Sequence, residues 1–200
     1  MVQFVYLASQ SPRRRQLLEQ LGVPYELLLP DAGEDTEVLE IARHNEAPLR
    51  YVTRVTGLKL DAASARLARR HLPPAPILCS DTTVALGRTI YGKPDNSSHA
   101  EQMLSELSGK THQVLTAVNI QCGPKRFCAV SRSRVSFEPM TADQISRYAA
   151  TGEPLGKAGA YAIQGRVSMH ITRINGSYSG IMGLPLWETA LLLRAAGFEI

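Results

Sequence analysis

Residues 7–18 read Leu7-Ala-Ser-Gln-Ser-Pro-Arg-Arg-Arg-Gln-Leu-Leu18. An apolar run that begins at Val2 ends at the serines of this segment, and Pro12 follows them at the position that proline favours at the start of a helix. Leu17, Leu18 and Leu21 then continue at helical spacing. The segment therefore predicts a strand, a tight turn and a helix.

The first turn of this predicted helix holds three arginines, Arg13, Arg14 and Arg15. This end of a helix carries unpaired amide donors and the positive end of the macrodipole, so three cations there are unfavourable for stability. A bound anion reverses the effect, because amides and guanidinium groups both bind phosphate oxygens. The turn is therefore a candidate phosphate site, and a solvated basic surface turn is the alternative.

The composition is that of an ordinary globular protein. A chain of 200 residues with 44% hydrophobic and 20% charged residues can bury a core, in one domain or in two closely joined lobes. The net charge of +4 is mild, and the aromatic content is 6%. Because the arginines are clustered, the charge suits a small anionic substrate better than a nucleic acid, and no nucleic-acid partner is expected.

The cysteines and the apolar segments bear on the protein's location. Cys79, Cys122 and Cys128 are odd in number and lack CxxC spacing, so they predict core thiols in a reducing compartment rather than a disulfide framework or a zinc site. The N-terminal apolar run is too short for a signal peptide, and no run reaches the roughly 18 residues of a membrane span. We therefore expect a cytoplasmic protein with no membrane partner.

Strand-like and helix-like segments alternate along the rest of the chain. The predicted strands are 23–29, 77–79, a hairpin at 84–91, 112–122, 126–137 and 169–174. The predicted helices are 49–71, one that is opened by Ser97 or Ser98 and ended by Gly109, one that runs from a Thr141–Gln144 capping box to Thr151, and 185–196. This order predicts an α/β fold in which helices flank a mixed sheet.

Four charged residues stand at predicted ends of elements, where functional side chains gather: Glu34, Lys59, Asp81 and Lys93. Asp81 follows an apolar strand and is a candidate to accept a proton from water or to bind a metal. Hydrogen bonding within its own turn is the alternative. Glu34 lies in an acidic loop, 30–37, which is a candidate cation site.

Familiar hydrolase motifs do not occur in the sequence. It contains no Walker A motif, no nucleophile elbow and no HExxH, and its five histidines lack ligand spacing. A serine or zinc hydrolase is therefore disfavoured. A phosphate-binding turn with dispersed lysines and carboxylates suits metal-assisted hydrolysis of a phosphoanhydride.

Seven motifs occur in order along the chain: Leu7-Ala-Ser-x-Ser-Pro-Arg-Arg-x-x-Leu-Leu18, Ser80-Asp-Thr82, Gly92-Lys-Pro94, Leu107-Ser-Gly-x-Thr-His112 with Thr116-Ala-Val118, Lys157-Ala-Gly-Ala-Tyr-x-Ile-Gln-Gly165, Ile174-Asn-Gly-Ser-Tyr178 and Gly183-Leu-Pro185. They resemble the Maf family of nucleotide pyrophosphatases, and the match is collinear from residue 4 to about 195. Together these motifs are highly specific, although each alone is weak.

The resemblance implies that residues 1–200 form a single domain with the fold of inosine-triphosphate pyrophosphatase-like enzymes, in which an elongated mixed sheet and flanking helices surround a deep groove between two lobes. It also implies hydrolysis of a nucleoside triphosphate between the α and β phosphates, with a divalent metal, Mg²⁺ or Mn²⁺, as cofactor. Position by position, Asp81 would be the proton acceptor, and Glu34 and Asp81 would be metal ligands. The implied phosphate contacts are Ser9, Arg14, Lys59 and Lys93.

Three positions differ between branches of the family, and here they hold Arg13, Thr82 and Gln164. This set resembles the branch that acts on dTTP and UTP, and modified pyrimidine nucleotides fit it as well. A Gln amide offers both a donor and an acceptor to the edge of thymine or uracil. One departure is that the interval from the acidic loop to Lys59 is several residues longer than usual in the family.

The resemblance also bears on partners. Such enzymes are often homodimers and are associated with arrest of septum formation and cell division. A nucleotide-sensing regulator of cell division, without significant turnover, is therefore the alternative function.

Overall fold

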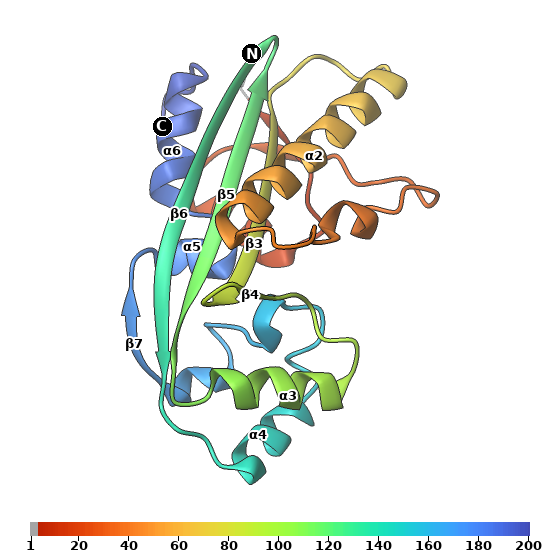
Figure 1. Ribbon diagram of the computed structural model, residues 1–200. Helices are drawn as coiled ribbons and strands as arrows, with labels where there is room; N and C mark the ends of the chain where they lie inside the picture. Colours follow the sequence, from red (N-terminus) through yellow and green to blue (C-terminus); the bar gives the residue numbers. More distant parts are fainter. Residues whose placement is uncertain (1–3) are drawn as a thin grey trace.

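A long antiparallel hairpin forms the axis of the molecule (Figure 1). In this computed structural model, which describes residues 4–200, β5 (Thr111–Cys122) pairs with β6 (Lys125–Phe137) from Thr111 opposite Ser136 to Cys122 opposite Lys125. Gly123 closes the turn with φ 55°, a left-handed conformation that glycine adopts at no steric cost. The hairpin predicted from residues 112–122 and 126–137 is confirmed.

Within the described residues, the sheet has seven strands in the order β2-β1-β3-β5-β6-β7, and β4 also pairs with β3. The other strands are β1 (Val5–Leu7), β2 (Tyr25–Leu27), β3 (Ile77–Leu86), β4 (Thr89–Tyr91) and β7 (Ile171–Asn175). β1 runs parallel to β2 and β3, and the remaining pairs are antiparallel. The predicted mixed α/β fold is therefore confirmed. Val2 and Gln3, the start of the first predicted strand, lie outside the described residues.

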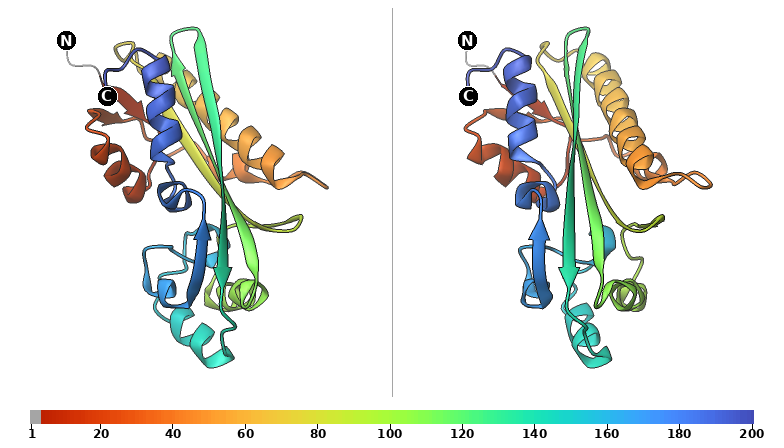
Figure 2. Two further views of the ribbon diagram at one scale, coloured as in Figure 1. Left: turned by 90° about the vertical axis from the view of Figure 1, so that its left-hand side faces the viewer. Right: turned by 60° about the vertical axis from the view of Figure 1, so that its left-hand side comes forward.

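Helices cover both faces of the sheet (Figure 2). In the upper half of Figure 1, α2 (Pro48–Arg69) and α6 (Leu186–Ala195) lie on opposite faces, while α3 (Ser97–Leu107) and α4 (Ala142–Ala149) pack together in the lower half. The remaining elements are α1 (Pro12–Gln20), α5 (Tyr178–Met182) and the 3-10 turns η1 (Glu37–Glu40), η2 (Ala158–Ala160) and η3 (Arg166–His170).

Apolar side chains are buried on both faces of the sheet. Val52 and Val55 of α2 are fully buried against β5. Leu193 of α6 packs with Leu18 of α1, and Leu104 lies in the core of the lower half. Each such side chain contributes roughly 1.5–3 kcal/mol by its burial. The packing of α2 also fixes which of its side chains lie over this face of the sheet.

Local signals set most helix ends as predicted. Pro12 and Pro48 open α1 and α2. The Thr141–Gln144 capping box is formed, with the Gln144 amide donating to Thr141 Oγ1 at 3.2 Å and the Thr141 amide donating to Gln144 Oε1 at 2.7 Å. The predicted cap of α3 was wrong by one or two residues. Asn96, rather than Ser97 or Ser98, accepts the His99 amide at 2.9 Å.

Two placements predicted from the sequence are corrected by the structure. β3 does not end before Asp81 but continues to Leu86, because every residue from 80 to 83 still pairs with β5. Lys59 lies in the middle of α2 rather than at an element end. Polar residues in mid-strand gave the false impression of a strand end.

The cysteines are free, and Cys79 is buried while Cys122 is half-buried and Cys128 is exposed. The prediction that all three belong to the core is therefore correct only for Cys79. Among residues 4–200, no helix has the length and apolar character required to cross a membrane.

Two glycine substitutions are expected to act in opposite directions. A Cβ at Gly159, where φ is 70°, would lie 2.8–2.9 Å from the Val84 side chain, so Gly159→Ala should lower the free energy of unfolding by about 1–3 kcal/mol. Gly57 lies within α2 with open space at its Cβ position, so Gly57→Ala should raise it by about 0.5–1 kcal/mol. Urea unfolding measures both, and a fully stable Gly159→Ala protein would contradict the close packing of η2 on β3.

Candidate functional site

The candidate site forms where β3 changes partners along one edge. β1 pairs with β3 only as far as Leu78, and β4 pairs with it only from Val84 onward. In the described part of the chain, no strand pairs with residues 79–83 on that side, although β5 pairs with them on the other. This edge of β3 therefore borders an opening between the two halves of the molecule.

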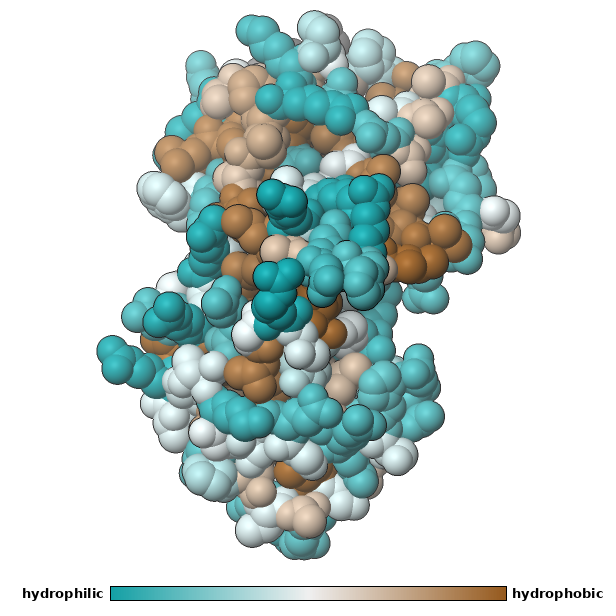
Figure 3. Space-filling view, in the orientation of Figure 1, coloured by the Kyte–Doolittle hydropathy of each residue, from teal (hydrophilic) through white to brown (hydrophobic). Residues whose placement is uncertain are grey.

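A cavity of about 550 Å³ occupies this opening, a volume in the usual range for small-molecule sites. Its walls come from the β1–α1 turn, η1, α2, the middle of β3, the end of β4, the segment 155–164 and the end of α5. On the face of the molecule seen in Figure 3, hydrophilic side chains gather across the middle, between the two halves. Eight of the predicted site residues line the cavity: Ser9, Arg13, Arg14, Lys59, Asp81, Thr82, Lys93 and Gln164.

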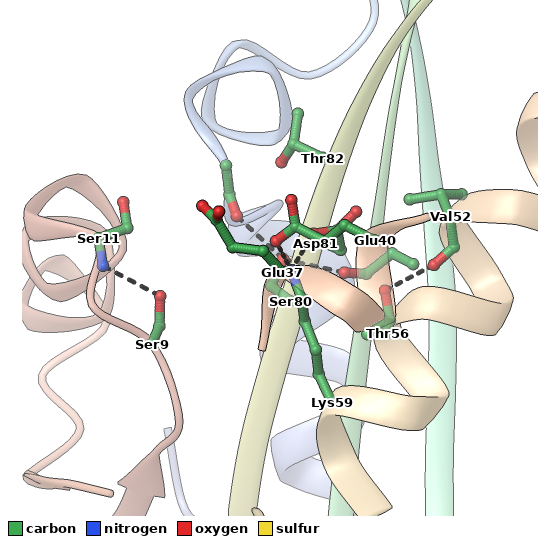
Figure 4. A network of polar contacts seen from close by, with 12 residues as sticks. Ser9, Ser11, Glu37, Glu40, Val52, Thr56, Lys59, Ser80, Asp81 and Thr82 are labelled. Atoms are coloured by element: carbon green, nitrogen blue, oxygen red, sulfur yellow. Dashed lines mark hydrogen bonds and ion pairs between the residues drawn. The ribbon is translucent and has the colours of Figure 1, made fainter. Parts of the chain in front are cut away.

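Lys59 joins two carboxylates at one wall of the cavity (Figure 4). Its Nζ donates to Asp81 Oδ1 at 2.5 Å and to Glu40 Oε1 at 2.7 Å. The three side chains are only 17%, 10% and 26% exposed, respectively, so solvent and salt screen their charges weakly. Asp81 is thus paired with a helix on one face of the sheet, and hydrogen bonding within its own turn does not account for its placement.

Lys93 extends this charge cluster from the end of β4. Its Nζ lies 3.2 Å from Glu40 Oε2 and 3.4 Å from Glu37 Oε1. Burial alone would raise the pKa of Glu40, but the ammonium groups of Lys59 and Lys93 outweigh it and hold that pKa below its usual range. Burial would lower the pKa of Lys93, and the carboxylates of Glu40 and Glu37 raise it instead. Alternating charges therefore run from β3 to the mouth of the cavity.

The arginine turn forms a second wall. Arg14 Nε donates to the Gly183 carbonyl at 2.8 Å, and Arg14 NH1 donates to Ser9 Oγ at 3.2 Å. Arg13 Nε donates to the Met182 carbonyl at 3.4 Å. Burial lowers the pKa of Arg14, yet a guanidinium stays protonated at neutral pH. Carbonyls at the end of α5 thus orient both cations, whose guanidinium groups line the cavity.

The third wall holds Thr82 and Gln164. Thr82 lies on the face of β3 toward α5, where its Oγ1 accepts from Thr116 Oγ1 at 3.1 Å. Gln164 is exposed and comes from the loop between η2 and η3. Lys157 also lines this part of the cavity, and burial together with the Arg13 guanidinium lowers its pKa. The structure therefore brings Arg13, Thr82 and Gln164 to one cavity although they are far apart in sequence.

Glu34 does not line this cavity. It forms close ion pairs with Arg66 and Arg69 near the end of α2. Arg66 is 3% exposed and also donates to the Leu28 carbonyl at 2.9 Å. The ion pairs tie the acidic loop to α2, so the structure places Glu34 in a contact that holds the loop and does not bring it to Asp81.

Glu40 and Thr83 also line the cavity but were not predicted as site residues, whereas Glu37 is the last residue of the acidic loop that was predicted as a candidate cation site. Glu37 and Glu40 are the two ends of η1, and Tyr51 Oη donates to the Glu40 carbonyl at 2.7 Å, which anchors this turn. Thr83 Oγ1 is buried and has no hydrogen-bond partner among the described residues. The one available signal for Glu40 was the long interval before Lys59, which is where η1 is found.

The donor set at this wall fits a hard divalent cation. Carboxylate oxygens are the ligands that Mg²⁺ and Mn²⁺ prefer, and Mg²⁺ is commonly held by one or two carboxylates together with substrate phosphates and water. Asp81 and Glu40 converge on the same ammonium, so both carboxylates face one small volume. Among residues 4–200, no group of three or more His, Cys, Asp or Glu side chains could by itself hold a metal ion. Two carboxylates suit an ion that binds together with a polyphosphate.

The chain is similar to known proteins over nearly its whole length. A family model described as "Maf-like protein" matches residues 4–196. A protein of Polaromonas sp. (strain JS666 / ATCC BAA-500), named dTTP/UTP pyrophosphatase, is 68% identical over 197 residues, 98% of each chain. Proteins with the same name from Albidiferax ferrireducens and Cupriavidus metallidurans are 62% and 61% identical, over 100% of each chain.

Removing the bridging ammonium should destabilise the protein in a pH-dependent way. Lys59→Met leaves the Glu40 carboxylate without its nearest cation, so the free energy of unfolding at pH 7 should fall by about 1–2 kcal/mol. The wild-type contribution of Glu40 is present above its ordinary pKa, because folding lowers that pKa, and is lost as pH falls through the folded value.

The difference in the free energy of unfolding between wild type and Lys59→Met should therefore shrink below about pH 4.5. Urea unfolding at a series of pH values measures it, with the exposed Lys125→Met as control. A deficit that is the same at pH 7 and at pH 3 would contradict the electrostatic account.

Proposed function

Because the chain belongs to the Maf-like protein family, we propose that it is a nucleoside triphosphate pyrophosphatase that hydrolyses dTTP and UTP to the monophosphate and pyrophosphate. The names of relatives that are 61–68% identical support the substrate class. The observation that carries the proposal is the Lys59 bridge between Asp81 and Glu40, on the wall of a cavity that is also lined by Arg14 and Lys93.

Asp81 is the proton acceptor in this proposal. Its Oδ1 accepts from Lys59, which leaves Oδ2 to accept a proton from the attacking water. The side chain is rigidly placed, because it projects from the middle of a strand and is 10% exposed. Attack on the α-phosphorus breaks the bond to the bridging oxygen, and pyrophosphate leaves.

The cations bind the polyphosphate. Arg14 keeps its planar guanidinium oriented by Gly183 and Ser9, and such a fork suits phosphate oxygens. Lys59 and Lys93 are held by carboxylates until phosphate oxygens arrive. Fixed positive charge of this kind stabilises the negative charge that develops on departing pyrophosphate.

Asp81 and Glu40 are the residues that would hold the divalent metal, Mg²⁺ or Mn²⁺, and Glu34 is the alternative ligand implied by the family resemblance. A bound metal would neutralise phosphate charge and lower the pKa of water. Asp81 and Glu40 already accept hydrogen bonds from one ammonium, whereas Glu34 is engaged by two arginines. We therefore favour Glu40.

Base selection is assigned to Arg13, Thr82 and Gln164. The Gln164 amide can donate to a carbonyl of thymine or uracil and accept from the ring N–H, whereas cytosine presents a different donor and acceptor pattern. A site built around such hydrogen bonds rejects a base that leaves its polar groups unpaired. Modified pyrimidine nucleotides that keep this edge would also be accepted.

Asp81→Asn should abolish turnover without abolishing binding, because the amide keeps the size of the side chain but cannot accept the proton of water. We expect wild type with Mg²⁺ or Mn²⁺ to release pyrophosphate from dTTP and UTP in a panel that includes CTP, GTP, 7-methyl-GTP and ATP. The Asp81→Asn rate should fall at least about 100-fold. Release of orthophosphate instead of pyrophosphate would contradict the proposal.

The same variant separates the enzyme from a nucleotide-sensing regulator. An enzyme that acts through hydrolysis should lose any effect on septum formation in cells when Asp81 is replaced by Asn. Nucleotide binding without turnover by wild type, combined with a cellular effect that survives Asp81→Asn, would favour the regulator.

Glu40→Gln and Glu34→Gln form a matched pair that distinguishes the two candidate ligands. Glu40→Gln should raise the Mg²⁺ concentration for half-maximal activity by about tenfold or more, because the amide is a weaker ligand. Glu34→Gln should leave that concentration unchanged and lower the free energy of unfolding, since it removes the partner of the buried Arg66. Magnesium titrations of activity and urea unfolding give the two readouts. The opposite pattern would return the metal role to Glu34.

A further inference from the structure

The Glu153 carboxylate contacts the loop that carries Gln164. Tyr148 Oη donates to Glu153 Oε1 at 2.8 Å. The backbone amide of Arg166 donates to both carboxylate oxygens, at 3.1 and 3.2 Å. Tyr148 is 7% exposed and projects from α4, so the carboxylate is tied to the core of the lower half. One acidic side chain thus connects a buried tyrosine to the backbone two residues after Gln164.

Gly165 has no room for a side chain because of this carboxylate. A Cβ built on Gly165 would lie 1.9 Å from Glu153 Oε1, and even a flexible side chain would have to leave its place. The Gly165 backbone has φ −95°, which any residue adopts, so backbone conformation does not demand glycine there. The space that a side chain would need is the space that Glu153 fills.

The same contacts reach the other end of the loop. The Ala162 amide donates to Tyr148 Oη at 3.4 Å, and the Gly165 amide donates to the Ala162 carbonyl at 2.8 Å, which closes a turn around Gln164. Just before it, Tyr161 Oη lies 2.8 Å from Nε2 of the buried His112. Gln164 is the exposed residue of a turn that is held on both sides.

We propose that Glu153 is a positioning residue for base selection: it fixes the turn that carries Gln164, so that the Gln164 amide meets the pyrimidine edge in one orientation. This rests on the proposed role of Gln164 in base recognition. A terminal amide discriminates only when it cannot rotate to exchange its donor and acceptor, and a support that is loose by about 1 Å loses this discrimination. Glu153 does not line the cavity, so it acts through the turn rather than on the nucleotide.

Glu153→Gln is the informative substitution, because it keeps the size of the side chain and removes the charge that strengthens the Arg166 hydrogen bonds. We expect the ratio of kcat/KM for dTTP over CTP to fall about tenfold, with KM for dTTP raised and kcat within about threefold of wild type. Tyr148→Phe should lower the ratio in the same direction. Glu138→Gln, which changes a carboxylate paired with His170 elsewhere in the lower half, should leave it unchanged.

A double-mutant cycle with Gln164→Ala separates this inference from the proposed function. Support requires that Gln164→Ala lowers the ratio and that Glu153→Gln lowers it no further in that background. If Gln164→Ala lowers the ratio but Glu153→Gln alone does not, the inference is overturned and the function stands. If Gln164→Ala leaves the ratio unchanged while dTTP is hydrolysed, the base assignment fails and the inference fails with it. An equal loss on dTTP and CTP, with a lower melting temperature, would show a merely structural role.

Discussion

The Lys59 ammonium, shared by Asp81 and Glu40, is the interaction on which the site depends. Two neighbouring carboxylates repel each other where the local dielectric is low, and an ammonium that binds both turns that repulsion into attraction. The arrangement needs three separate elements in place. α2 must pack through Val52 and Val55 so that Lys59 reaches across the sheet, β3 must run on through Asp81, and η1 must carry Glu40 back over the strand. The positions of the charged groups in the cavity therefore depend on the packing of the core.

The change of partner along β3 explains why this chemistry is accessible. Because β1 stops at Leu78 and β4 starts at Val84, polar side chains in the middle of a buried strand border a cavity instead of a neighbouring strand. Alternation along the strand sends Asp81 toward α2 and Thr82 toward α5, so one short segment serves two walls. Lys59 and Lys93 cluster with Asp81 and Glu40, whereas Arg13, Arg14 and Thr82 lie toward the end of α5 and Gln164 comes from the lower half. This arrangement gives the cavity a direction, from the lysines to Gln164, along which an extended nucleotide would lie.

Features with local causes could be predicted from the sequence, and features that depend on distant contacts could not. Pro12, the Gly123 turn and the Thr141–Gln144 capping box each act within a few residues, and each was placed correctly. The end of β3 was misplaced because Ser80 to Thr83 look like a turn until the pairing with β5 is known. Glu40 was missed because its partner Lys59 is 19 residues away, and the long interval before Lys59 does not by itself single out this glutamate. Eight predicted residues do meet in one cavity, but the family resemblance, rather than spacing, had grouped them.

A crystal structure with Mg²⁺ and α,β-imido-dUTP, which cannot be cleaved at the bond in question, tests the account most directly. We expect the α-phosphorus beside Asp81, the metal between Asp81, Glu40 and the phosphates, and the uracil edge against Gln164. A nucleotide bound in the reverse direction, with its base at Lys59 and Lys93 and its phosphates at Gln164, would contradict it.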